Sequence, residues 1–282
     1  MTSEIILVGN ELLIGKIRDI NGYWMIQRLL EYGHDVSRMI LIPDEITVIA
    51  KTILESLFRE PMFLFISGGL GPTHDDLTFE GIARALNLPL VLNSEALGFI
   101  KERYSKLGKE GITSTELYES RKKMALLPEG AIPLRNLNGT APSIMIEAQN
   151  TNKTKIFAMP GVPSEFQSAF NHYVVPLLQH SDSHYLQAGF IFENVGESQI
   201  AAEIDTLQEE HPEIWIKTHP RIVVSLHEPI HKPICVELHL TSFINSPSLE
   251  DIDKRKRSIL ELRNKIKKIV ENKGGLVRNE YD

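Results

Sequence analysis

Hydrophobic and polar positions in the first 178 residues form two alternating patterns. Short unbroken apolar runs indicate buried strands, because a parallel strand covered on both faces has no polar side. Apolar residues spaced three and four apart indicate the helices between them. The predicted strands are 4–9, 36–42, 62–66, 144–148 and 155–159, the last two as a hairpin, and the predicted helices are 21–33, 43–57, 79–86, 95–106, 114–124 and 164–178.

Strands that alternate with helices predict an α/β fold with a mainly parallel sheet and helices on both faces. The pattern changes after the polar stretch 179–184, which we interpret as a linker. That later pattern predicts a second, smaller α+β domain, and we expect two domains, 1–178 and 185–282. The predicted elements of the second domain are a strand at 190–192, a helix around 200–207, strands at 214–217, 222–226 and 234–240, and a helix at 249–272.

The 282-residue chain has 42% hydrophobic and 24% charged residues and a net charge of −7. This acidic balance argues against bulk binding of nucleic acid, and an anionic ligand would need backbone N–H groups, a few basic side chains or a metal ion. The single Cys235 excludes an intrachain disulfide and a zinc site of several thiolates. No leader-like segment opens the sequence and no apolar run approaches ~18 residues, so we expect a cytoplasmic protein without membrane contact.

The most informative segment is the glycine-rich turn Ser67–Thr78, which follows a buried strand. Its glycines permit positive φ angles and close backbone approach, so several N–H groups can face one anion, and a helix that begins behind them adds positive charge. Its paired aspartates can hold a divalent cation against phosphate oxygens. The alternative is a tight strand-to-helix turn with a capping aspartate. The residues concerned are Gly68, Gly69, Gly71, Asp75 and Asp76.

Polar loops next to other predicted strands lie at the same edge of the sheet, where open α/β folds bind ligands. They offer amides, hydroxyls, carboxylates and free N–H groups. As alternatives, each is an ordinary turn, and Asn21 and Asp44 are helix N-caps. The loop residues singled out are Gly9, Asn10, Glu11, Asn21, Asp44, Asn138, Gly139, Thr140, Pro160, Gly161, Ser164 and Glu165.

Other patterns only imitate functional motifs. The stretch 227–231 matches the H-E-x-x-H zinc pattern, but Pro229 opposes the helix that this pattern requires, so we interpret the stretch as a hairpin tip. The basic run 254–257 lies on a helix with a continuous apolar stripe, and we interpret it as the solvated face of a docked helix rather than an RNA site. For His74, beside the paired aspartates, proton transfer is one alternative, and we favour loop positioning or simple solvation.

Loop segments that match the CinA family in order are Gly9–Gly15, Pro43–Glu45, Ser67–Thr78, Asn138–Pro142 and Pro160–Glu165. Residues 1–178 therefore resemble the CinA family and the molybdopterin-binding (MoaB/Mog-like) superfamily. Residues 182–282 look like the small α+β domain that follows in CinA proteins, through Val195–Ser198 before a helix.

The resemblance implies a three-layer α/β domain, homodimers or larger homo-oligomers and, for CinA proteins, metal-dependent hydrolysis of ADP-ribose at its pyrophosphate. It also implies that Asp44 and Asp76 match the essential aspartates of molybdopterin-handling relatives. Ser143 stands where the family commonly has glycine, and we expect it to crowd a ligand. The C-terminal domain with which many CinA proteins deamidate nicotinamide mononucleotide has no counterpart in this sequence, so we expect that activity to be absent or supplied by another chain.

We therefore expect an enzyme that converts ADP-ribose to AMP and ribose 5-phosphate. Asp76, Asp75 and Asp44 are the expected catalytic residues, and Asp75, Asp76 and Glu11 the expected ligands of Mg²⁺ or another divalent cation. The alternatives are binding or adenylylation of a molybdopterin-type pterin phosphate, and a non-catalytic nucleotide-sensing or scaffold subunit. The residues expected to contact substrate are Gly9, Asn10, Glu11, Asn21, Gly68, Gly69, Gly71, Thr73, Thr78, Asn138, Gly139, Thr140, Pro160, Gly161, Ser164 and Glu165.

Overall fold

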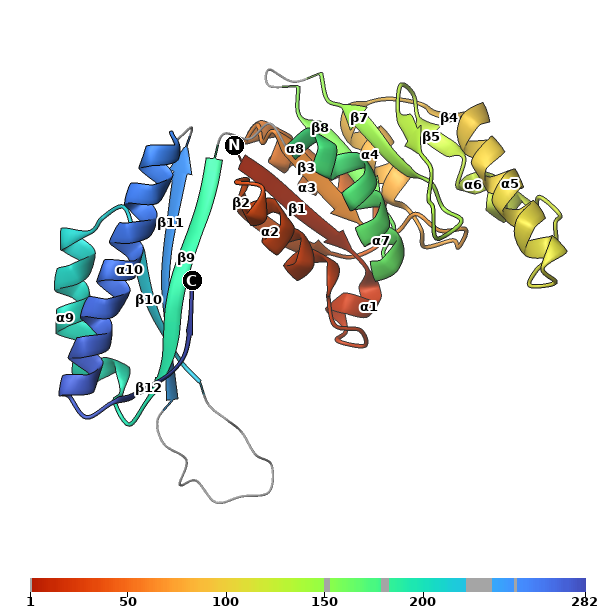
Figure 1. Cartoon of the computed structure of the whole chain (residues 1–282). Coiled ribbons are helices and arrows are strands. Elements are labelled where there is room, and N and C mark those ends of the chain that lie inside the picture. Colours follow the sequence, from red (N-terminus) through yellow and green to blue (C-terminus); the bar gives the residue numbers. More distant parts are fainter. Residues whose placement is uncertain (1, 150–152, 179–182, 222–234, 246–247) are drawn as a thin grey trace. The chain divides into compact units, whose positions relative to one another are not determined.

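A computed structural model describes residues 2–149, 153–178, 183–221, 235–245 and 248–282. The chain divides into two compact units, each with its own hydrophobic core (Figure 1). The first unit comprises Met1–Leu30 and His34–Ser181, and the second comprises Glu31–Gly33 and Asp182–Asp282.

The strands of the first unit are β1 (Thr2–Val8), β2 (Asp35–Ile42), β3 (Phe63–Ser67), β4 (Leu90–Leu92), β5 (Leu126–Pro128), β6 (Ile132–Leu134), β7 (Ser143–Glu147) and β8 (Lys155–Met159). Six of them form one sheet in the order β2-β1-β3-β8-β7-β6. The first four in this order are parallel, whereas β7 runs antiparallel to β8 and β6 antiparallel to β7. The sheet is therefore mostly parallel. The hairpin predicted for strands 144–148 and 155–159 is confirmed by the antiparallel pair β7 and β8.

The helices of this unit are α1 (Asn10–Leu13), α2 (Asn21–Glu31), α3 (Ile46–Phe58), α4 (Thr78–Leu86), α5 (Ser94–Lys109), α6 (Glu119–Lys123), α7 (Pro163–Ala169), the π-helical turn η1 (Phe170–Val174) and α8 (Val175–Leu178).

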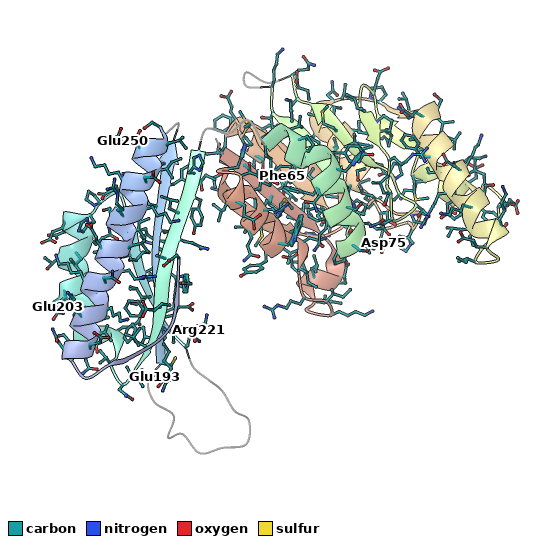
Figure 2. All side chains as sticks on the ribbon, in the orientation of Figure 1. Phe65, Asp75, Glu193, Glu203, Arg221 and Glu250 are labelled. Carbon is teal, nitrogen blue, oxygen red and sulfur yellow. The ribbon has the colours of Figure 1, made fainter. Side chains whose placement is uncertain are left out.

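Both faces of the large sheet are covered, because alternate residues of each strand point to opposite sides. Ile6 and Ile66 belong to a core that includes apolar residues of α3, α4 and α5. On the other face, Phe65, labelled in Figure 2, packs against Phe170 with ring centroids 5.6 Å apart. Phe170 in turn contacts Trp24 of α2, with ring centroids 5.4 Å apart. The first unit therefore has the expected three layers.

The structure differs from the sequence predictions in several short segments. The predicted helix 114–124 is wrong, because only 119–123 is helical. The guanidinium of Arg121 donates to the carbonyls of Ser114 and Glu116, both at 2.6 Å, and these bonds hold the preceding residues in a loop. The three-residue strands β4, β5 and β6 were not predicted, because so few residues carry no measurable periodicity.

The second unit consists of β9 (Ser183–Glu193), α9 (Glu197–Glu210), β10 (Trp215–Pro220), β11 (Cys235–Asn245), α10 (Leu249–Asn272) and β12 (Leu276–Tyr281). Its strands form an antiparallel sheet in the order β10-β11-β9-β12, the expected smaller α+β arrangement. The apolar stripe of α10, which includes Ile259 and Ile266, is buried against Phe190 and Leu238 of the sheet. The basic run 254–257 therefore lies on a helix whose apolar face packs on the sheet, as predicted.

Some sequence predictions for this second unit differ from the structure or are not tested by it. Ser183 and His184 belong to β9 instead of the predicted linker, and β12 was not predicted. The predicted strand 222–226 and the histidine motif 227–231 lie outside the described residues.

Among the helices that the structure describes, none is both long and apolar enough to cross a membrane.

Burial of His34 makes the stability of the first unit depend on pH. The side chain is 1% exposed and its ring packs against Phe63 at 5.6 Å, and burial lowers the pKa of His34 below its usual 6.5. The unfolded chain therefore binds a proton below that pH more readily than the folded chain does, so stability is lost as pH falls.

We expect His34→Phe to reduce the loss of unfolding free energy between about pH 7.5 and about pH 5.5, by at most about 1.4 kcal/mol for each pH unit below 6.5. Urea unfolding of both proteins at the two pH values measures this difference. An equal pH dependence in wild type and variant would contradict the assignment to His34.

Candidate functional site

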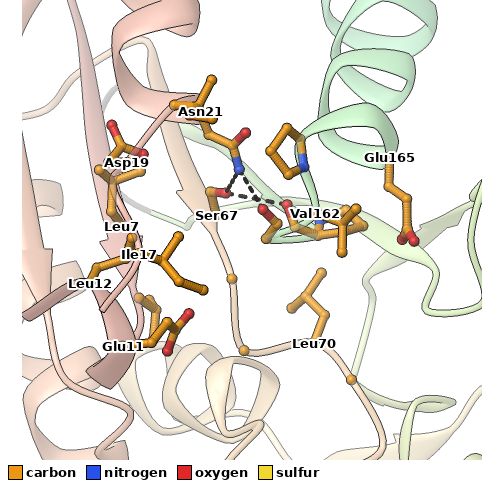
Figure 3. A pocket seen from close by; sticks show the side chains of 18 of the residues that line it. Leu7, Glu11, Leu12, Ile17, Asp19, Asn21, Ser67, Leu70, Val162 and Glu165 are labelled. Carbon is orange, nitrogen blue, oxygen red and sulfur yellow. Dashed lines mark hydrogen bonds between the residues drawn. The ribbon is translucent and has the colours of Figure 1, made fainter. Parts of the chain in front are cut away.

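A pocket of about 490 Å³ lies at the carboxyl ends of β1, β3 and β8 (Figure 3). After β1 the chain passes to β2 on one side and then to β3 on the other. The loops that leave β1 and β3 therefore diverge, and parallel sheets bind ligands in such a crevice.

The turn after β3 is shaped by the close approach of two backbones. Gly68 has a φ angle of 105°, and a Cβ at this position would overlap the carbonyl oxygen of Val8. Gly69 also has a positive φ angle, 66°. Thr78 holds the turn through two hydrogen bonds: its hydroxyl donates to Gly68 O at 2.7 Å, and its N–H donates to Gly69 O at 3.1 Å. Only glycine meets these conditions at position 68 without strain.

This turn leaves backbone donors at the pocket. Gly69, Leu70 and Gly71 line it, and their N–H groups make no hydrogen bond within the described part of the chain. The N-terminus of α4 follows the turn and adds partial positive charge. Successive free N–H groups near a helix N-terminus attract an anion.

Asn21 ties together the loops that follow β1, β3 and β8. Its Nδ2 donates to Ser67 Oγ at 3.0 Å and to Gly161 O at 2.8 Å (Figure 3). The Ser67 hydroxyl in turn donates to Pro160 O at 3.3 Å. Because Asn21 is only 5% exposed, it acts mainly as a fixed link between these loops.

The lining of the pocket also contains carboxylates. Glu11 and Asp76 line it, and Asp44 lies next to them, where it accepts the N–H of Asn10 at 2.7 Å. Burial raises the pKa of Asp44, and the negative charges of Glu11, Asp75 and Asp76 raise it further, against the lowering effect of the Asn10 N–H. Negative charge concentrated in this way favours a bound cation.

Lys123 fixes the loop that carries Asp76, and no sequence pattern pointed to this residue. Its Nζ donates to Thr73 O at 2.8 Å and to Asp76 O at 2.6 Å. Within the loop, the Thr73 N–H donates to Asp76 Oδ2 at 2.8 Å. Gly71 leaves room for this carboxylate, because a Cβ there would lie 2.7 Å from Asp76 Oδ2.

The far wall of the pocket is a loop packed on the start of α7. Asn136, which the sequence analysis missed, donates from Nδ2 to Glu165 Oε2 at 2.7 Å and accepts the Gly139 N–H at 2.7 Å. Asn138 donates to Ser164 O at 3.1 Å. A Cβ at position 139 would overlap the Glu165 carboxylate, so the glycine permits this packing.

The expected site residues fall into two groups. Those that line the pocket are Glu11, Asn21, Gly68, Gly69, Gly71, Asp76, Thr140, Pro160, Gly161 and Glu165. Those that support this lining without being part of it are Gly9, Asn10, Asp44, Thr73, Thr78, Asn138, Gly139 and Ser164.

Asp75 and Ser143 do not lie where the sequence analysis expected. The Asp75 carboxylate is 56% exposed, accepts the Thr73 hydroxyl and is not part of the pocket lining (Figure 2). His74 is 97% exposed beside it. Ser143 is fully buried at the start of β7 and does not line the pocket, so it cannot crowd a ligand there.

Pocket residues that the sequence analysis missed are mostly apolar: Leu7, Val8, Leu12, Ile17, Ile20, Leu70, Ala141, Val162 and Pro163. Ser67 had a readable signal, because it is the polar last residue of a buried strand directly before the glycines.

The chemistry of the lining fits a magnesium ion only in part. Within the described residues, no group of three or more His, Cys, Asp or Glu side chains is arranged to hold a metal ion. Mg²⁺, however, usually takes one or two carboxylates and completes its shell with water and phosphate oxygens. Glu11 and Asp76 are the two carboxylates that meet this requirement next to the free N–H groups.

Comparison with known proteins gives the first unit a family context. Residues 4–180 match the family model described as a probable molybdopterin-binding domain. The structure is similar to that of the CinA protein of unknown function from Thermoplasma acidophilum, with a TM-score of 0.55 and 30% sequence identity, covering 63% of this chain and 99% of that one.

Relatives also match over nearly the whole chain. A protein of Sulfurisphaera tokodaii is 36% identical over 276 residues, which covers 98% of this chain and 97% of the relative. A protein of Pyrococcus furiosus is 43% identical over 202 residues, or 71% of this chain and 78% of that protein. Both units therefore occur together in the first of these relatives.

We expect Lys123→Ala to loosen residues 73–76, because two carbonyls lose a charged donor. The amide of Thr73 should exchange hydrogen roughly tenfold faster, and the protein should lose about 1 kcal/mol of unfolding free energy. Lys122→Ala is the control, because Lys122 Nζ binds Glu119 at 2.6 Å on the same short helix. Equal exchange in the two variants would contradict the role of Lys123.

Proposed function

Because the chain belongs to the molybdopterin-binding domain family, and to its CinA-like members, we propose that its pocket binds a phosphorylated nucleotide or pterin and hydrolyses a pyrophosphate bond with the help of a divalent cation. The observation that carries this proposal is the pairing of free backbone N–H groups with carboxylates in one pocket. Gly69, Leu70 and Gly71 supply the N–H groups, and Glu11 and Asp76 supply the carboxylates.

The N–H groups and the carboxylates of the pocket have different effects on a bound phosphate. The N–H groups stabilise phosphate oxygens without adding a mobile charge, and they are held in place by Thr78 before any ligand arrives. The carboxylates cannot contact phosphate favourably by themselves, since like charges repel. A divalent cation held by these carboxylates would remove this conflict, and it would supply a more acidic water molecule and neutralise charge on the reacting phosphoryl group.

Each charged side chain then has a defined task. Asp76, fixed through its loop by Lys123, and Glu11, on the loop after β1, would hold the cation. Asp44 holds the loop that carries Glu11 through the Asn10 N–H. In the hydrolysis, the oxygen of water forms a new P–O bond and releases a proton to solvent as the bridging P–O bond breaks, and Arg18 at the pocket wall neutralises the leaving phosphate.

We propose ADP-ribose as the substrate class, with AMP and ribose 5-phosphate as products. The volume of the pocket, about 490 Å³, lies within the range of small-molecule sites. The second candidate, favoured by the family match over 4–180, is binding or adenylylation of a pterin phosphate. A site that binds such a ligand without turnover, as in a sensing subunit, is the third.

Incubation of the protein with Mg²⁺ and, separately, ADP-ribose, FAD and NAD should release AMP from ADP-ribose, and EDTA should abolish this release. Chromatography of the nucleotides measures it. No AMP from any of the three, with protein shown to be folded by circular dichroism, would contradict the hydrolase proposal and leave the two binding proposals.

Asp76→Asn should lower kcat/KM for ADP-ribose by at least roughly a hundredfold, because it removes a carboxylate from the metal side of the pocket. Asp75→Asn should cause a much smaller loss, because the Asp75 carboxylate does not line the pocket. Steady-state kinetics at saturating Mg²⁺ compares them. Retention of more than about a tenth of the wild-type rate by Asp76→Asn would remove Asp76 from this role.

The pterin candidate has its own test, which combines a binding measurement with an assay of adenylylation. If the site evolved for a pterin phosphate, isothermal titration should show tighter binding of a pterin phosphate than of ADP-ribose, and addition of ATP and Mg²⁺ should release pyrophosphate. Weaker binding of the pterin phosphate would favour the nucleotide.

A further inference from the structure

A second, smaller cavity opens beside the main pocket and has the opposite charge. Its volume is about 170 Å³, and it is formed by α5 and the loop that begins at Arg135. The residue that connects the two cavities is Thr140, which lines both. We call the smaller cavity the side pocket; its charged lining residues are Glu102, Arg103, Lys106 and Arg135.

The linings of the two cavities have opposite net charge. The lining of the main pocket contains Glu11, Asp19, Asp76 and Glu165 against the single cation Arg18. An anion in the main pocket therefore needs a metal ion as well as the backbone donors. The side pocket has three cationic side chains against one carboxylate, so an anion can bind there without a metal.

Two of the three cations are held in fixed positions. Arg135 forms a bidentate pair with Glu102, at 3.0 and 2.6 Å, and its guanidinium lies 4.8 Å from the centre of the Phe99 ring. Arg103 donates to Asn138 O at 2.8 Å, which joins α5 to the loop between the two cavities. These contacts use only part of each guanidinium's donor capacity.

Lys106 differs from the two arginines, because each arginine has a hydrogen-bond partner. In the part of the chain that the structure describes, its ammonium group makes no hydrogen bond or ion pair, although it lines the cavity one turn from Glu102 and Arg103. An ammonium group of this kind can turn toward a phosphate at the cost of side-chain entropy alone.

We propose that the side pocket binds a second anionic group of the ligand whose pyrophosphate lies in the main pocket, so that the preferred substrate carries a further phosphate beyond the pyrophosphate. This inference rests on the proposed function for the position of the pyrophosphate. The shared Thr140 is the point where the ligand passes from one cavity to the other. The substrate class is then a phosphorylated ADP-ribose or a dinucleotide with an extra phosphate.

The first experiment uses inorganic phosphate in EDTA, which tests the side pocket without the main site. Phosphate should shift the Nε–H resonance of Arg135 in the NMR spectrum of the full-length protein. Lys106→Gln should weaken the apparent affinity by roughly threefold to tenfold. Lys109→Gln, on the same helix but outside the cavity, should leave it unchanged. No shift in the wild type, or equal affinities in the two variants, would overturn the proposal.

The second experiment compares ADP-ribose with ADP-ribose 2′-phosphate in the presence of Mg²⁺, by isothermal titration. The extra phosphate should strengthen binding to the wild type roughly tenfold, and Lys106→Gln should remove most of this gain while Lys109→Gln keeps it. If both compounds bind equally, the two anionic groups do not share one ligand and the inference fails, while the proposed function stands. If neither compound binds but inorganic phosphate does, the proposed function fails and the side pocket remains an anion site.

Discussion

The contact between Gly68 and the carbonyl of Val8 is the constraint on which the site depends. It brings the end of β3 against the end of β1, and a side chain at position 68 would separate them. Once the backbones are this close, Asn21 can link the loops of three strands with one amide group. The N–H groups of the glycine turn are then directed by the fold before any ligand arrives, so little ordering entropy is lost on binding.

Electrostatics divides the first unit into regions with different requirements. Burial and the surrounding carboxylates raise the pKa of Asp44, so the main pocket carries negative charge that opposes an anion. The lining of the side pocket has more cationic than acidic side chains. The two cavities share Thr140, so the ligand that we propose would extend between regions of opposite charge. An arrangement of this kind selects ligands by the positions of their charges as well as by their shape.

Much of the fold could be predicted because its signals are local. The buried runs that became β1, β3 and β8 and the stripe of α10 are read directly from periodicity. The helix expected at 114–124 failed for a non-local reason, since Arg121 binds loop carbonyls that no helical pattern encodes. The three-residue strands β4, β5 and β6 exist only because each pairs with another strand, and three residues do not reveal such pairing.

Local patterns were enough to place glycines, aspartates and polar loops after successive strands, and therefore at one edge of a parallel sheet. Packing in three dimensions selects which of them face the pocket: Asp76 does, whereas its neighbour Asp75 points outward. It also decided that Lys123 holds a loop 47 to 50 residues away and that α5 supplies a basic side pocket. Such contacts depend on how separate elements pack, and local patterns of hydrophobicity carry no record of that packing.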